Sequence, residues 1–243
     1  MKLHPETIPS PQDYAEAFRL ESAKAYPEID RLEQSVGFAL DRAKLEAAAQ
    51  VLACPVKASP PNWQHGRVIY TVARRYLAAT PGPSFLFLDI GTAKGFSALC
   101  LQWALLDSGV SGVVESVDVI DPRAKVFRNS VRDTESENRL ADYHREWPDA
   151  SRIVFHKCTG LQWLLKSDER VHIAFVDGKH SGDVVREEAK RLASRQQPWD
   201  LAIFDDVQLP GIADALYGLR SLYDCTHIEL ATANRKYAVG VRK

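Results

Sequence analysis

Three short apolar segments of this chain end in acidic residues, and this feature most restricts the fold. The segments FLFL at 85–88, IAFV at 173–176 and LAIF at 201–204 have the length of buried strands. They are followed by Asp89, Asp177 and the pair Asp205–Asp206. Ligands of open parallel sheets bind outside the carboxyl ends of the strands. The sequence therefore predicts that these carboxylates line the rim of a binding site.

Strand-like and helical segments alternate from about residue 63 onward. The pattern predicts strands at 85–89, 113–119, 152–156, 172–176 and 201–204, and helices at 64–79, 95–106, 123–146, 160–165, 183–193 and 212–222. Two further strands, 227–231 and 237–241, are joined too closely for a parallel crossover, so they should form an antiparallel hairpin at the edge. These units predict an α/β fold with a doubly wound, mostly parallel, seven-stranded, Rossmann-like sheet.

The first 62 residues form a separate compositional block that is polar, rich in alanine and interrupted by prolines. Helical spacing is present at 13–25 and 41–54, and Pro27 is expected to close the first of these segments. Such helices bury little apolar surface alone. We therefore expect residues 1–62 to form an N-terminal helical cap over a domain that spans residues 63–243.

Composition excludes several classes of function. A formal net charge of −1 over 243 residues gives no electrostatic case for nucleic acid or an anionic membrane. The four cysteines form no CxxC pair, which disfavours zinc ribbons and redox motifs. The N-terminus has no apolar signal region, and no run approaches the ~18 apolar residues of a membrane helix. A cytoplasmic enzyme is the expectation.

The segment Asp89 to Ser97 predicts a strand, a tight turn and a helix start. Gly91 can let a ligand approach the backbone, amides at the helix start can bind a carboxylate, and Asp89 can bind an ammonium group. Ala93 replaces the second glycine of the dinucleotide fingerprint, which disfavours a nicotinamide cofactor. Lys94 is expected to face solvent. A turn with a purely structural role is the alternative.

Further along, an acid near the end of the second strand can bind the two hydroxyls of a ribose. Asp118 is preferred for this role over Asp121. After the other two apolar segments, Asp177, Asp205 and Asp206 would repel one another without a counter-charge. A hard divalent cation such as Mg²⁺ would relieve that repulsion with oxygen ligands. Helix capping or solvated loop carboxylates are the alternative.

Together, the motifs DIGTxxGFS, SVDV, FVDGxH and IFDD resemble the class I S-adenosylmethionine (SAM)-dependent methyltransferases. Within that superfamily the chain is most similar to the small metal-dependent O-methyltransferases of the macrocin and catechol types. The resemblance covers roughly residues 64–243. It implies SAM and Mg²⁺ as cofactors and a small-molecule acceptor.

The resemblance also implies roles for individual positions. The implied cofactor-binding residues are Asp89, Gly91, Thr92, Gly95 and Ser97 at the methionine portion, Asp118 at the ribose, Thr159 beside the adenine, and Asp177. Asp177, Asp205 and Asp206 fall on the magnesium ligands, and His180 falls on the position of a general base in some members. Lys179 stands where other relatives place an acidic base, and Gln196–Trp199 replaces a Pro-Gly-Gly turn.

The predicted function is therefore SAM- and metal-dependent O-methylation of a hydroxyl on a sugar, natural product or phenol. The alternatives are a non-catalytic protein that binds SAM or a nucleoside, and a nicotinamide-dependent oxidoreductase. The cap and residues 133–148 are expected to shape the acceptor pocket. His65 and Arg67 could face that pocket or serve only in packing. A homodimer is possible through the cap or the edge hairpin.

Overall fold

One twisted sheet organises the molecule, which we describe for residues 8–59 and 61–243 of a computed structural model. Residues 1–7 and Pro60, which belong to the predicted cap, lie outside the described residues. The strands are β1 (Phe85–Ile90), β2 (Gly112–Asp118), β3 (Ile153–Lys157), β4 (Ile173–Val176), β5 (Leu201–Phe204), β6 (Tyr223–Leu230) and β7 (Arg235–Arg242). Their order is β3-β2-β1-β4-β5-β7-β6, with only β7 antiparallel to its neighbours β5 and β6. The predicted sheet and hairpin are confirmed.

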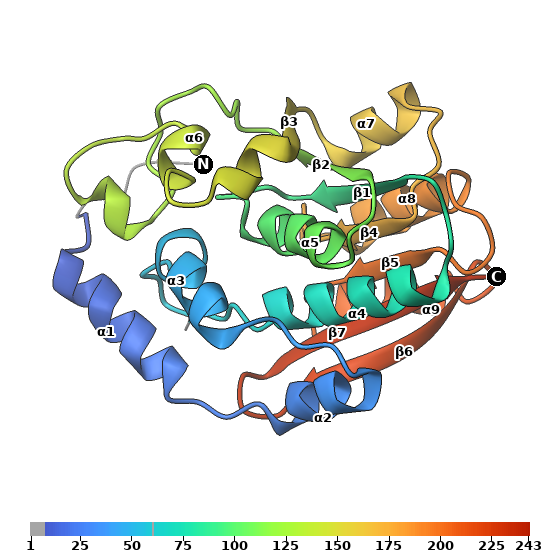
Figure 1. The fold of residues 1–243 in the computed structure, drawn as a ribbon, viewed down its shortest axis with the longest axis horizontal. Helices are drawn as coiled ribbons and strands as arrows, with labels where there is room; N and C mark the ends of the chain where they lie inside the picture. Colours follow the sequence, from blue (N-terminus) through green and yellow to red (C-terminus); the bar gives the residue numbers. More distant parts are fainter. Residues whose placement is uncertain (1–7, 60) are drawn as a thin grey trace.

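Helices cover both faces of this sheet (Figure 1). α4 (His65–Ala79) and α5 (Phe96–Asp107) pack on one face, and α7 (Gly160–Lys166), α8 (Gly182–Ala193) and α9 (Pro210–Tyr217) pack on the other. Successive strand residues point to opposite faces. Phe87 accordingly joins the apolar cluster with α4 and α5, whereas Leu88 joins the cluster with α8 and α9. The central strands β4 and β5 are apolar throughout because both of their faces are covered.

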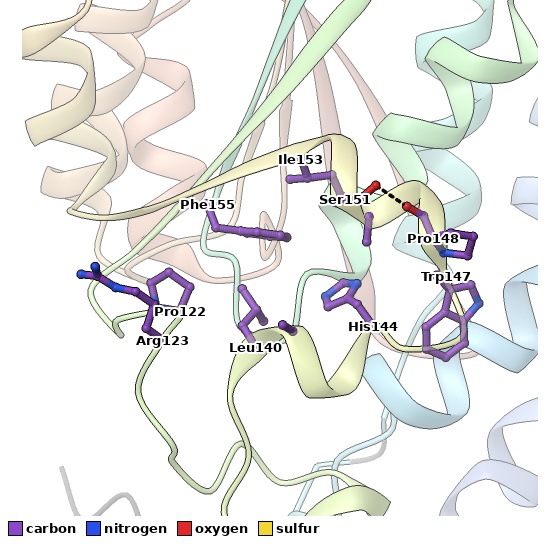
Figure 2. Close-up of a pocket in the computed structure, with 11 residues that line it drawn as sticks. Pro122, Arg123, Leu140, His144, Trp147, Pro148, Ser151, Ile153 and Phe155 are labelled. Atoms are coloured by element: carbon purple, nitrogen blue, oxygen red, sulfur yellow. Dashed lines mark hydrogen bonds between the residues drawn. The ribbon is translucent and has the colours of Figure 1, made fainter.

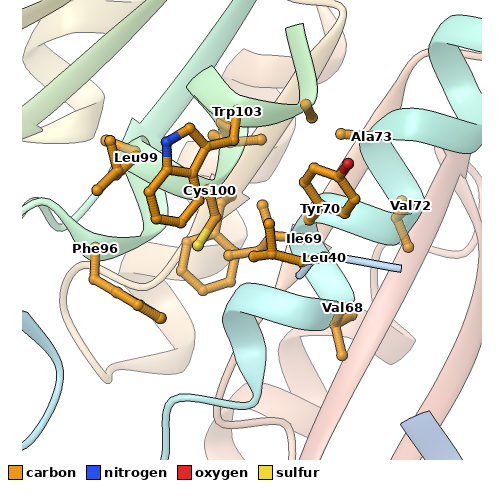
Figure 3. Close-up of a cluster of buried hydrophobic side chains, with 14 of the residues drawn as sticks. Leu40, Val68, Ile69, Tyr70, Val72, Ala73, Phe96, Leu99, Cys100 and Trp103 are labelled. Atoms are coloured by element: carbon orange, nitrogen blue, oxygen red, sulfur yellow. The ribbon is translucent and has the colours of Figure 1, made fainter. Parts of the chain in front are cut away.

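The larger apolar cluster is centred between α4 and α5, where Ile69, Tyr70, Leu99 and Trp103 pack together (Figure 3). Trp103 is fully buried, and Tyr70 is 3% exposed. The hydroxyl of Tyr70 reaches the surface to donate to Asp107 Oδ2 at 2.8 Å. This packing fixes the start of α5, which directly follows the glycine turn.

Three helices precede α4: α1 (Pro11–Ser22), α2 (Pro27–Val36) and α3 (Arg42–Leu52). α3 lies within the predicted segment 41–54, and α1 overlaps the predicted segment 13–25 but begins two residues before it. α2 was not predicted. Pro27 is the first residue of α2, where a missing amide hydrogen costs nothing, and Gly37 ends the helix with φ +79°. The interpretation of Pro27 as the end of a helix therefore missed α2, although Pro27 and Gly37 are typical first and last residues of a helix.

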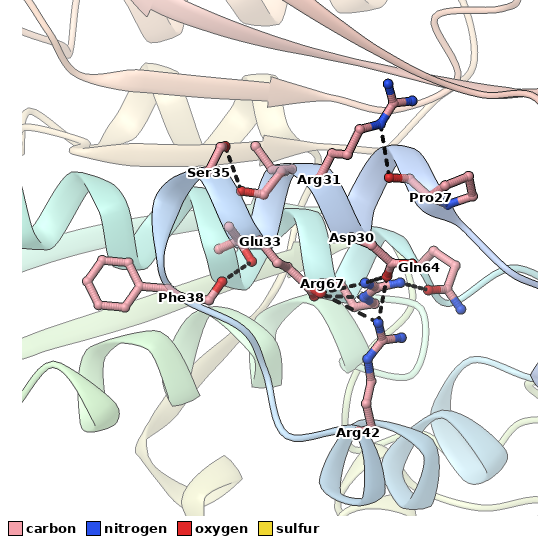
Figure 4. A network of polar contacts seen from close by, with 11 residues as sticks. Pro27, Asp30, Arg31, Glu33, Ser35, Phe38, Arg42, Gln64 and Arg67 are labelled. Atoms are coloured by element: carbon pink, nitrogen blue, oxygen red, sulfur yellow. Dashed lines mark hydrogen bonds and ion pairs between the residues drawn. The ribbon is translucent and has the colours of Figure 1, made fainter.

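A buried ion-pair network joins α2 to α4 (Figure 4). Arg67 is 1% exposed, and its guanidinium contacts Glu33 at 2.7 Å and Asp30 at 2.5 Å. The amide oxygen of Gln64 accepts a further hydrogen bond from it at 3.1 Å. A buried guanidinium is tolerated only when its donors are satisfied, as they are here. Arg67 therefore docks the first helices on α4.

The helix predicted at 123–146 is wrong. This segment instead contains the short helices η1 (Val131–Thr134) and α6 (Leu140–Tyr143), with η2 (Pro148–Arg152) just after it. The carboxylate of Asp133 accepts backbone N–H groups of Arg128 at 2.9 Å and Ser130 at 3.0 Å. Such local bonds compete with the helical ladder and favour a turn. In the described part of the chain, no helix has the length and apolar character needed to cross a bilayer.

Candidate active site

The register of the parallel strands brings the acidic residues at their ends together. Ile90 pairs with both Val117 and Val176, and Val176 pairs with Phe204. The residues that follow these strand ends are Gly91, Asp118, Asp177 and Asp205, which therefore lie along one edge of the sheet. This is the edge at which open parallel sheets bind ligands.

The glycine turn is held against the end of β4. Gly91 has φ +104°, and a Cβ there would lie 2.3 Å from the carbonyl oxygen of Asp177. Only glycine fits this contact without moving a strand end. Gly95 opens α5 with φ +79°, and a Cβ there would lie 2.7 Å from the His144 ring. Both glycines are thus required by backbone conformation as well as by close packing.

Asp89 lies beneath this turn and is fully buried. Its Oδ2 accepts the Ser116 hydroxyl at 2.5 Å, while Oδ1 has no hydrogen-bond partner among the described residues. Burial raises the pKa of Asp89 to about 6, although hydrogen bonds from Ser116 and Ser97 oppose the rise. An orphaned carboxylate oxygen next to a binding turn can bind a cationic ligand group.

Two further predicted cofactor positions, Asp118 and Thr159, are organised by backbone contacts. Asp118 accepts the N–H groups of Ala93 and Ile120, each at 2.9 Å. Its oxygens keep free lone pairs, so a diol can still bind them. Thr159 caps α7 by accepting the N–H of Gln162 at 3.1 Å. Thr92 is 4% exposed, and its hydroxyl lies 2.6 Å from that of Ser116.

Asp177, His180 and Asp206 form a compact cluster, with one potential ligand atom from each lying within 4.8 Å of the others. His180 Nδ1 lies 2.7 Å from Asp206 Oδ2 and 3.9 Å from Asp177 Oδ1. Asp206 adopts φ +56°, which bends the chain just after β5. The hydrogen bond with Asp206 raises the pKa of His180. Burial, Asp205 and Asp206 raise the pKa of Asp177.

Asp205 lies beside this cluster and has a different partner. Arg235 donates to both Asp205 oxygens at 3.3 Å and also pairs with Asp206. Burial raises the pKa of Asp205 to about 6, although Arg235 opposes the rise. Sequence reasoning assigned no role to Arg235. Its position follows from topology: β7 runs antiparallel to β5, so the start of β7 lies beside the end of β5.

A cavity of about 160 Å³ opens at this edge of the sheet. Of the predicted site residues, it is lined by Gly91, Thr92, Ser97, Asp177 and Asp205. His65 and Lys94 also line it, together with Leu52, Pro55, Lys57 and Asn62 from the chain before α4. His65 Nδ1 donates to the Asn62 carbonyl at 3.2 Å, and its ring stacks on Phe175. The expectation that Lys94 faces solvent is wrong, because its residue is only 6% exposed.

A larger cavity, of about 490 Å³, lies on the α5 side of β3 (Figure 2). Its walls come from Ile153 and Phe155 of β3, from α6 and η2, and from Pro122 and Arg123. It shares no lining residue with the smaller cavity. Five residues of segment 133–148 line the larger cavity, and none lines the smaller one. The segment expected to shape the acceptor pocket thus borders another space.

The two carboxylates of the cluster fit a hard divalent cation, which prefers oxygen ligands. Two carboxylates and an imidazole converge, and the side chains of Asp177, Asp206 and His180 are 27%, 13% and 54% exposed. Water or a ligand can therefore reach the remaining coordination positions. Asp205 is less available, because its side chain is only 3% exposed. Arg235 contacts both of its oxygens and also Asp206, and one Asp205 oxygen accepts the Asp206 N–H at 2.6 Å.

Comparison with known proteins finds a matching family model and several similar solved structures. Residues 88–207 match the model of a family described as "Methyltransferase domain". No curated protein matches the chain in sequence. Among solved structures, the chain is similar to an O-methyltransferase from Bacillus cereus in complex with SAH, with 13% identity, a TM-score of 0.56, and coverage of 95% of this chain and 100% of that chain. It is also similar to cofactor-bound Rv0187 from MTB, with 18% identity, a TM-score of 0.54, and coverage of 97% and 99%. At these identities the likeness shows a common fold.

Proposed function

We propose that this chain, a class I SAM-dependent methyltransferase by its methyltransferase domain and its fold, methylates a hydroxyl oxygen of a small molecule with the help of a divalent cation. The observation that carries the proposal is the convergence of Asp177, His180 and Asp206 beside the cavity that Gly91 and Asp177 line. Carboxylates next to a cofactor turn suit a reaction in which an acceptor oxygen must lose its proton.

In this proposal the glycine turn positions the cofactor. Methyl transfer from a sulfonium is an in-line displacement, so its rate depends mainly on holding the acceptor oxygen against the methyl carbon. Gly91 allows close approach to the backbone, Asp89 binds the ammonium group, and Asp118 binds the ribose hydroxyls. Ser97 and the first amides of α5 face the carboxylate, and Thr159 lies towards the adenine.

Asp177 and Asp206 are the carboxylates that we propose to hold the cation, with Asp205 and Arg235 supporting Asp206. Mg²⁺ prefers oxygen to imidazole, which leaves His180 available as a base. When bound, a divalent cation would lower the pKa of an acceptor hydroxyl. His180 then receives the proton, and its hydrogen bond to Asp206 stabilises the imidazolium that forms.

The cap residues contribute the acceptor side of the cavity. Leu52 and Pro55 line it from the segment that we propose as the cap, residues 1–62. A small polar cavity of this kind suits a sugar, polyol or phenol. The orphaned Asp89 oxygen favours this proposal over a nicotinamide-dependent oxidoreductase, because it suits a cationic amino-acid portion.

The test is transfer of a labelled methyl group from SAM to a panel of sugar, polyol, phenol and catechol acceptors, with Mg²⁺ and with chelator. Turnover should require Mg²⁺, and His180→Ala should lower it at least tenfold while metal binding persists. His227→Ala, an exposed histidine on β6, is the matched control. Full turnover in chelator would contradict metal dependence. SAM binding without transfer to any acceptor would favour a non-catalytic binding protein.

A further inference from the structure

Lys94 is a buried cation that the proposed mechanism does not use. Its ammonium donates to the carbonyl oxygens of Arg128 at 3.2 Å and Asn129 at 3.3 Å. Within residues 8–59 and 61–243, no carboxylate forms an ion pair with it. Because an ammonium group has three donors, one remains for another acceptor.

The surroundings of Lys94 stabilise its charge poorly. Burial lowers the pKa of Lys94 to about 8, a fall that Asp133 and Cys54 oppose and that Lys57 and Arg128 reinforce. His144 also contacts this residue, through a hydrogen bond of 2.8 Å from Nε2 to the Lys94 carbonyl oxygen. A buried charge is normally paired. Two backbone carbonyls are a weak substitute for an anion, so the site is short of one negative charge.

The cavity supplies the place for that anion. Lys94 lines it together with Gly91 and Ser97 of the same turn and with Lys57. Asp89, of opposite charge, lies at the base of the turn with one free oxygen. Cations at one position and a free carboxylate oxygen at another complement a zwitterion. The amino-acid portion of SAM is the zwitterionic part of the cofactor.

We propose that the Lys94 ammonium binds the carboxylate of the methionine portion of SAM, with Lys57 as the second cation of this subsite. This assignment rests on the proposed function, and in particular on SAM occupying the glycine turn. A carboxylate carried by the acceptor is the other source of the same chemistry. The experiment below separates the two sources.

The test compares S-adenosylhomocysteine (SAH) with its decarboxylated analogue by calorimetry in wild type, Lys94→Met and Lys125→Met. Lys125 is the matched control, since it is an exposed lysine on the same loop as Arg128. Lys94→Met should weaken SAH binding about 10- to 100-fold at pH 7, the range of a charge-assisted hydrogen bond. The analogue should bind wild type and Lys94→Met equally, and Lys125→Met should match wild type with both ligands.

A pH series adds a readout that a merely structural role would not change. Lys94 carries its charge below pH 8, so the affinity advantage of wild type over Lys94→Met should be largest at pH 7 and shrink above pH 8. The amino group of the ligand titrates in both proteins, so the ratio isolates Lys94. If Lys94→Met does not fold, Lys57→Met should weaken SAH, but not its analogue, about threefold.

Equal weakening of SAH and the analogue in Lys94→Met would overturn the assignment, because it would mean that the lysine only supports the turn. Unchanged SAH binding in Lys94→Met would also overturn the assignment. It would mean that Lys94 binds a carboxylate of the acceptor and not that of SAM. A wild type that binds neither SAH nor the analogue would contradict the proposed function itself.

Discussion

At the scale of single residues, the site combines groups whose charges are set by burial. Asp89 is fully buried with one unpaired oxygen, whereas the nearby Asp118 is half-buried and accepts two backbone N–H groups. Burial makes Asp89 costly to ionise. Asp89 is therefore suited to a cationic ligand group, because the cation would stabilise the carboxylate charge that burial disfavours.

The pKa of Asp89, about 6, predicts a pH dependence of cofactor binding. Below pH 6 the carboxyl is protonated and cannot attract an ammonium group, so SAH affinity should fall about tenfold between pH 7 and pH 5. Asp89→Asn should bind SAH weakly and without this dependence. Calorimetry of wild type, Asp89→Asn and the exposed control Asp224→Asn would measure it. The same slope in Asp89→Asn as in wild type would assign the titration to another group.

At the scale of elements, the contact between the glycine turn and β4 matters most. The turn and the strand meet backbone to backbone at Gly91 and Asp177, so the two halves of the site cannot move independently. The glycine turn and the acidic cluster are thus held together by one contact. The geometry of methyl transfer depends on this contact as much as on the side chains.

Gly91→Ala should therefore destabilise the protein by about 3 kcal/mol or more, because its Cβ would lie 2.3 Å from the Asp177 carbonyl at φ +104°. Gly37→Ala is the matched control, since its φ is +79° but nothing lies within 4 Å of the added Cβ. It should cost only about 1 kcal/mol. Urea denaturation of both variants gives the comparison. Equal losses would mean that φ alone, and not the contact with β4, sets the cost.

The sequence predicted correctly the strands and helices that are indicated by residues within the element itself. The apolar runs that end at Asp89, Asp177 and Asp205 predicted three strands and their common edge. It failed where a local rule has two meanings. Pro27 can end one helix or begin another, and Asp133 can be a helix residue or the acceptor that folds a turn. The partner contacts decide between these meanings, and a single sequence does not contain them.

At the scale of the whole molecule, the C-terminal hairpin and the segment before α4 add charged residues to the site at the ends of the parallel strands. The antiparallel insertion of β7 beside β5 carries Arg235 to the acidic cluster, a consequence of topology that no motif near Asp205 reveals. Likewise, Lys94 is buried by segments 54–57 and 128–129, which lie far from it in sequence. The counter-charges of the site were therefore missed, although its carboxylates were found.

The measurement that tests the central claim most directly is a calorimetric Mg²⁺ titration of the SAH complex of wild type and an Asp177→Asn, Asp206→Asn double variant. Wild type should bind one Mg²⁺, and the double variant should bind none while keeping SAH affinity within about threefold, because the cation is proposed to hold the acceptor. Asp183→Asn, an exposed acid on α8, is the control. Equal Mg²⁺ binding by wild type and the double variant, or none by either, would contradict a metal-dependent methyltransferase.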